Sequence, residues 1–226
     1  MEWPPSAGTL VAFLAVAFVA VVIYMGVRFK REVREQEQAR AAVQEEVRRC
    51  AAAKGRRFES GTGEAVWTIH GKLSDGQAWA LAYKAGYATR GTPRVIQRDW
   101  LFGERLDWRC PAFKRDALAF SFYKRIDGKK RQDELAFDEG DELWQRWRLE
   151  ARDEATARRA FGADASALLL KLPLARYGNV NIDQNTSISL GKDGIVATVG
   201  TDGLTPELVD LWIEIAQTVA AAIKQA

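Results

Sequence analysis

The sequence is poor in the side chains that most often carry chemistry. It has a single histidine, His70, and only two cysteines among 226 residues. A metal site built from several histidines is therefore excluded, and the spacings H-E-x-x-H and C-x-x-C are both absent. His70 falls on the polar side of an alternating segment, which favours a solvated surface histidine. His70 could in principle form a catalytic triad with Ser121 or a cysteine, but no feature of the sequence connects these residues.

The two cysteines, Cys50 and Cys110, are too few to define a disulfide framework. Free cysteines usually behave as small, partly buried apolar side chains, which is one interpretation of this pair. The other interpretation is a single bridge between them, which requires that the domain face an oxidising compartment. The sequence leaves both interpretations open.

The glycine patterns of nucleotide-binding proteins are missing as well. No G-x-x-x-x-G-K-[ST] occurs, and no G-x-G-x-x-G opens a helix after a strand. The acidic stretch 133–142 lacks the ligand spacing of an EF-hand loop and is interpreted as a solvated loop. The sequence therefore predicts no catalytic residue, no cofactor or cofactor-binding residue and no metal-binding residue.

An excess of charge of one sign is found in only one segment. Residues 28–57 hold ten basic and five acidic side chains, whereas the balance is −1 in residues 1–27 and −1 in residues 58–226. The formal net charge of +3 thus comes from residues 28–57. A nucleic-acid-binding domain is expected to carry a basic face of its own, so we predict no nucleic-acid partner.

Charge is absent altogether between Trp3 and Val27. Residues 8–27 are long enough, at ~1.5 Å per residue, to cross the ~30 Å hydrocarbon core of a bilayer. A buried core helix and a cleaved signal peptide are the alternatives. The charge cluster that follows, and the lack of a basic N-terminus, favour a transmembrane helix in contact with lipid. The predicted domains are a tail with a transmembrane helix (1–27), a basic juxtamembrane helix (28–57) and a soluble domain (58–226).

The flanks of the apolar segment predict an orientation. Lysine and arginine are absent before it and frequent directly after it, at Arg28, Lys30, Arg31 and Arg34. Under the positive-inside rule, the N-terminus lies outside the cell inner membrane and the domain lies in the cytoplasm. The same four side chains are candidates for contact with anionic lipid.

The remainder of the chain is typical of an α+β fold. Apolar and polar residues alternate around Trp67 and Ile69, and Asp75-Gly76 is a favoured hairpin turn. Further strands are expected at 94–102, 104–110, 117–124, 147–151, 179–183, 187–190 and 195–199, and short helices near 153–161 and 164–172. From Pro206 an apolar stripe at helical spacing, with Trp212 as its anchor, predicts a C-terminal amphipathic helix packed on antiparallel sheet.

Tryptophan is frequent, with eight residues. Large aromatic side chains on the inner faces of strands are ordinarily core, and we interpret most of these tryptophans in that way. If a ligand stacks on an aromatic ring, Trp100, Trp108 and Trp144 are the candidates, because the sequence places them less clearly in the core.

Three features of the chain carry a family resemblance. They are the helix end Cys50-Ala51-Ala52-Ala53-Lys54-Gly55 leading into Arg57-Phe58, the tryptophan-bearing hairpin, and the stretch 147–159 with Leu168-Leu169-Leu170 after it. Together with the apolar segment, they resemble uncharacterised bacterial membrane-anchored proteins that have one N-terminal span and an α+β soluble domain. The resemblance implies a bacterial inner-membrane location and supplies no activity or site residues.

These observations favour a membrane-tethered, non-enzymatic interaction module with an unknown protein partner. The alternative is a membrane-associated enzyme whose carboxylate- or arginine-based site has no recognisable spacing. A third hypothesis is a sensor of the membrane surface that uses the basic segment. A concave pocket that holds carboxylates of perturbed pKa would favour the enzyme.

Overall fold

The computed structural model describes most of the chain. Its described residues are 7–61, 65–84, 104–124, 134–135, 143, 146–173, 186–201 and 203–224, without the side chains of 7–17, 33, 36 and 124. The chain divides into two units, Met1–Glu46 and Val47–Ala226, and each is described by itself.

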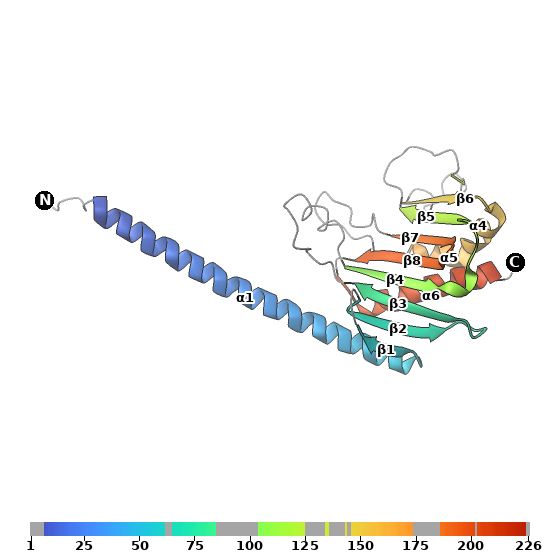
Figure 1. The fold of residues 1–226 in the computed structure, drawn as a ribbon, viewed down its shortest axis with the longest axis horizontal. Coiled ribbons are helices and arrows are strands. Elements are labelled where there is room, and N and C mark those ends of the chain that lie inside the picture. Colours follow the sequence, from blue (N-terminus) through green and yellow to red (C-terminus); the bar gives the residue numbers. More distant parts are fainter. Residues whose placement is uncertain are drawn as a thin grey trace. The chain divides into compact units, whose positions relative to one another are not determined.

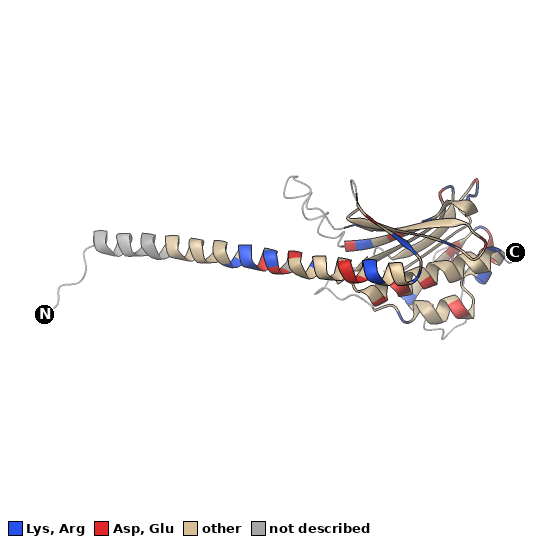
Figure 2. Ribbon diagram, turned by 90° about the horizontal axis from the view of Figure 1, so that it is seen from below, with Lys and Arg blue, Asp and Glu red and all other residues tan. Residues whose placement is uncertain are grey.

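Most of the first unit is the helix α1, which runs from Ala7 to Ala53 and so continues into the second unit. Along its charged part, Figure 2 shows basic and acidic residues in alternation, and Arg28 pairs with Glu32 across one turn at 2.8 Å. Arg31 and Glu35 make a second pair of the same kind at 2.8 Å. Exposed pairs of this spacing contribute about 0.3–0.5 kcal/mol each, so they support the helix only modestly.

The predicted transmembrane helix is contradicted. In the part of the chain that the structure describes, no helix is both long and apolar enough to cross a membrane. The described apolar stretch of α1, 18–27, spans only about 15 Å at the helical rise, which is about half of a hydrocarbon core. Residues 8–17 of the predicted segment lie outside the described side chains. The predicted orientation and the lipid contacts of residues 28–34 depended on that helix, and no described feature tests them.

The second unit is built on one antiparallel sheet, as predicted. Its eight strands lie in the order β1-β2-β3-β4-β8-β7-β5-β6, and every neighbouring pair is antiparallel (Figure 1). The strands are β1 (Arg57–Ser60), β2 (Trp67–Lys72), β3 (Ala78–Lys84), β4 (Glu104–Cys110), β5 (Phe120–Lys124), β6 (Trp147–Ala151), β7 (Ser187–Gly191) and β8 (Gly194–Thr201). Strand β1 was not predicted, and the predicted strands 94–102 and 179–183 lie outside the described residues.

The helices of this unit share one face of the sheet, as both views show (Figures 1 and 2). They are α4 (Glu154–Ala160), α5 (Ala163–Leu169) and the predicted C-terminal helix α6 (Pro206–Lys224), with a short 3-10 helix, η1 (Pro111–Phe113), after β4. Helix α6 begins where Thr205 caps it, since the Thr205 hydroxyl accepts a hydrogen bond from the N–H of Leu208 at 3.2 Å. The α+β fold with a C-terminal helix is thus confirmed.

The core lies between this face of the sheet and α6. One row of paired residues crosses the sheet from Ile69 through Trp108 to Leu149, and all three side chains are buried. Trp212 of α6 is fully buried, and its indole N–H donates to the carbonyl of Ala197 at 3.4 Å. The apolar stripe read from the sequence therefore faces the sheet, with Trp212 at its centre.

A buried ion pair lies beyond the outermost strand, β6. The Nε of Arg148 is 3.1 Å from a carboxylate oxygen of Glu134, and these side chains are 2% and 0% exposed. The neighbouring N–H of Leu135 donates to the carbonyl of Leu149 at 2.8 Å. The pair therefore fastens the segment 134–135 along the edge of β6.

We predict that Trp212→Ala lowers the free energy of unfolding by about 3–5 kcal/mol, because it leaves a large cavity between α6 and β8. Urea denaturation of the full chain measures this. The matched control is Leu118→Ala, since Leu118 is 49% exposed and its truncation should change the midpoint little. Equal midpoints for both variants would contradict the packing described.

We also predict that Arg148→Met destabilises the chain by about 3–5 kcal/mol, because it leaves the Glu134 carboxylate buried without its main cation. The double variant Arg148→Met/Glu134→Leu should recover most of that loss, since no buried charge remains. The same denaturation measurement tests both, and a double variant as unstable as the single one would refute the explanation.

Candidate binding groove

A groove of about 650 Å³ lies where the end of α1 meets β1, β2 and β3. Its lining is dominated by basic side chains and has no acidic one among the described residues. The lining residues are Lys54, Gly55, Arg56, Arg57, His70, Gly71, Lys72, Ala78, Trp79 and Gln217. All of them belong to the second unit.

The turn after α1 places the arginines of this groove. Gly55 takes a left-handed conformation with φ of +66°, which a residue with a Cβ rarely adopts. The N–H of Gly55 then donates to Ala52 and that of Arg56 to Ala51, at 3.0 and 2.9 Å. This pair of bonds ends the helix and directs the chain into β1, where Arg57 pairs with His70 of β2.

Two carboxylates beside the groove hold its cations in place. Asp210 of α6 accepts Lys54 at 2.8 Å and Arg56 at 2.7 Å. Glu59 of β1 lies 3.0 Å from Arg57. It also contacts the Nε2 of His70 at 3.0 Å. Two acidic side chains thus pair with three of the four lysines and arginines of the lining, so the groove keeps a positive surplus.

Lys72 carries part of that surplus. It is exposed at the end of β2 and makes no ion pair with a described residue. Arg57 is 69% exposed despite its contact with Glu59, so its guanidinium has free donors facing solvent. These two side chains are therefore the ones most able to bind an anion from solution.

Trp79 closes the groove on its apolar side. The strand register sets Trp79 opposite Gly71, and a Cβ on Gly71 would come within 2.2 Å of the indole ring, so only glycine permits this packing. The guanidinium of Arg56 lies 5.7 Å from the ring centroid, which is within range of a cation–π contact. The indole N–H of Trp79 is buried and has no hydrogen-bond partner among the described residues.

The sequence predicted these residue types but not their assembly. His70 lies on the polar face of β2, as predicted, where its partly exposed side chain contacts Glu59. Lys54, Arg56 and Arg57 were counted only in the basic excess of residues 28–57. The missing information was the pairing of β1 with β2, because the four residues of β1 have no alternation that would mark a strand.

The other sequence candidates fall elsewhere. Trp108 is fully buried, so its assignment as a stacking candidate is corrected to core, while Trp100 and Trp144 lie outside the described residues. Cys50 and Cys110 are both free thiols, which settles the choice between bridge and thiols. Burial raises the pKa of the Cys110 thiol, so it is less reactive than an exposed cysteine.

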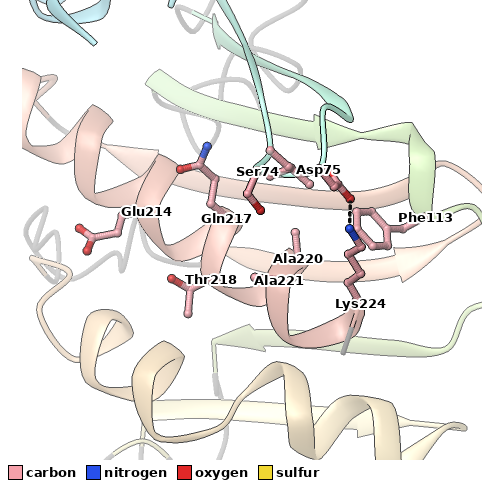
Figure 3. A pocket seen from close by; sticks show the side chains of 10 residues that line it. Ser74, Asp75, Phe113, Glu214, Gln217, Thr218, Ala220, Ala221 and Lys224 are labelled. Carbon is pink, nitrogen blue, oxygen red and sulfur yellow. Dashed lines mark ion pairs between the residues drawn. The ribbon is translucent and has the colours of Figure 1, made fainter. Parts of the chain in front are cut away.

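A second, smaller hollow of about 300 Å³ lies between the β2–β3 turn, η1 and α6 (Figure 3). Asp75 and Lys224 face each other beside Phe113, with 2.8 Å between the ammonium and the carboxylate. The bond from Lys224 and one from the N–H of Gln77 lower the pKa of Asp75. Asp75 therefore stays ionised near neutral pH and is unsuited to donate a proton.

Neither a metal site nor a similar protein indicates the function of this chain. Within the described residues, no group of three or more histidine, cysteine, aspartate or glutamate side chains could hold a metal ion. Searches against protein families, curated proteins and solved structures found no match.

We predict that Lys224→Gln raises the pKa of the Asp75 carboxyl toward its ordinary value, because the glutamine amide donates a weaker, uncharged hydrogen bond. Carbon-detected NMR titration of the aspartate carboxyls measures this. Asp153 is the internal control, because its pKa is lowered by Thr156 and should not change. A pKa of Asp75 that is the same in both proteins would show that the ion pair does not form in solution.

Proposed function

We propose that this chain is a non-enzymatic interaction module that binds an anionic group of its partner in the cationic groove. The observation that carries the proposal is the surplus of positive charge at a concave site in a unit that is otherwise close to neutral. Residues 58–226 have a balance of −1, and three cations from the preceding segment, Lys54, Arg56 and Arg57, join Lys72 in lining one hollow. Concentrated charge of one sign in a cleft attracts and holds ligands of the opposite sign.

The arrangement of the cations supports binding by pre-organisation. Asp210 fixes Lys54 and Arg56, and Glu59 fixes Arg57, so less side-chain entropy is lost when an anion arrives. The exposed guanidinium of Arg57 can donate hydrogen bonds to oxygens of the ligand. Carboxylates and phosphates accept such bonds, and arginine binds both in a bidentate manner.

The lining also supports binding over catalysis. Among the described residues, the lining has no hydroxyl, thiol or carboxylate side chain, so its histidine, His70, has no hydroxyl or thiol nucleophile there to activate. In the second hollow, the pKa of Asp75 is shifted downward and its partner is Lys224. A carboxyl group that acts as a general acid near neutral pH needs a raised pKa, which is the opposite of the shift at Asp75.

We predict that the chain binds triglutamate, a short anionic probe, and that Arg57→Gln/Lys72→Gln weakens this binding about fivefold to tenfold, since each exposed ion pair is worth up to about 1 kcal/mol. Titration calorimetry measures the affinity, and the indole N–H signal of Trp79 in NMR spectra reports the place of binding. Added salt should weaken the binding, because exposed charges are screened.

The matched control is Lys171→Gln/Lys192→Gln, which removes the same charge from exposed positions that do not line the groove. It should bind triglutamate about as well as the unaltered chain. If both double variants lose affinity equally, binding follows net charge and not the groove. If the unaltered chain does not bind the probe at all, the proposed function is wrong.

A further inference from the structure

The two edges of the sheet differ in how they are covered. Along β6, the N–H of Leu135 donates to Leu149, and Glu134 forms a bridge with Glu150, so this edge has a neighbour. On the other side the sheet ends at β1, and no described strand pairs with its outer side (Figure 1). An uncovered edge strand is a template for pairing with another chain.

The hydrogen bonds of the neighbouring strands show which groups of β1 are available. Leu73 donates to Gln77 and Gly61 donates to Val66, both at 2.8 Å. Hydrogen-bonded pairs alternate with non-bonded pairs along an antiparallel ladder. Given the register, the two bonds above imply that the N–H and C=O groups of Arg57 and Glu59 point toward β2. The N–H and C=O groups of Phe58 and Ser60 then point outward, away from the sheet.

Arg57 and Phe58, which are consecutive at this edge, present a cation and an aromatic ring on opposite faces of the sheet, and Glu59 on the Arg57 face is paired with Arg57 and His70. Phe58 lies on the helix side of the sheet and packs on Trp67, with 5.7 Å between the ring centroids. Arg57 lies on the opposite side and lines the groove. At these two positions, a strand added beside β1 would therefore meet an aromatic ring on one face and a cation on the other.

Resting on the proposed function, we infer that the partner presents an extended protein segment in which an acidic residue stands next to an apolar one. This segment adds to the sheet along β1, with its backbone bonded to Phe58 and Ser60. One acidic side chain enters the groove beside Arg57, and an apolar one packs against Phe58. Main-chain bonds supply affinity in such complexes, and the alternate side chains supply specificity.

The test uses the full chain with two probes. An octapeptide of alternating glutamate and valine is long enough to form a strand, whereas triglutamate measures groove binding alone. Ser60→Pro removes the outward N–H, and an edge strand tolerates proline when that N–H is not used within the sheet. The matched control is Ser60→Thr, which retains the N–H and suits a strand.

We predict that Ser60→Pro weakens octapeptide binding about fivefold to tenfold, as expected for the loss of one interface hydrogen bond. It should leave triglutamate binding unchanged, and Ser60→Thr should bind both probes like the unaltered chain. Should Ser60→Pro unfold, a second measurement decides. An octapeptide with N-methyl groups on the amides that face β1 must bind the unaltered chain about as weakly as triglutamate.

The remaining outcomes would overturn either this inference or the proposed function on which it rests. If triglutamate binds but Ser60→Pro and N-methylation leave octapeptide affinity unchanged, the groove binds anions without strand addition, and only this inference is wrong. If neither probe binds, the proposed function is wrong too. If single-stranded oligouridylate binds more tightly than the octapeptide, the partner is a nucleic acid and not an acidic protein segment.

Discussion

The packing of α6 across the sheet is the interaction on which the rest of this fold depends. A strongly apolar row crosses the sheet on one face, and α6 covers it with Trp212 at the centre. Burial at about 25 cal/mol per Å² makes a large aromatic side chain in this place worth several kcal/mol. The same helix carries Asp210 on a half-exposed side, so the element that closes the core also fixes the basic side chains at the end of α1.

The groove follows from that arrangement and from the end of α1. Gly55 turns the chain out of the helix, Arg56 binds Asp210, and Arg57 enters the sheet opposite His70. Positive charge is thereby gathered where the sheet also has its open edge. A binding function based on this site needs no catalytic residue. The site combines basic side chains, the packed ring of Trp79 and the outward N–H groups of Phe58 and Ser60.

The sequence was sufficient where a pattern is local and insufficient where it is not. The alternation in β2 and β3, the helix end at Gly55 and the stripe of α6 were all predicted, because each is set by periodicity or by one backbone requirement. Strand β1 and the groove were not predicted, because they arise from pairing between residues 57–60 and 67–70. The transmembrane helix was predicted from the length of an uncharged apolar run and from the basic cluster after it, and no described helix meets the requirements of length and apolarity.

The most direct test of the central claim is a crystal structure of the chain in complex with triglutamate. The account predicts a carboxylate of the probe within hydrogen-bonding distance of Arg57 and Lys72. A probe held at another surface, with the groove closed by contacts among Arg57, Glu59 and Lys72, would contradict it.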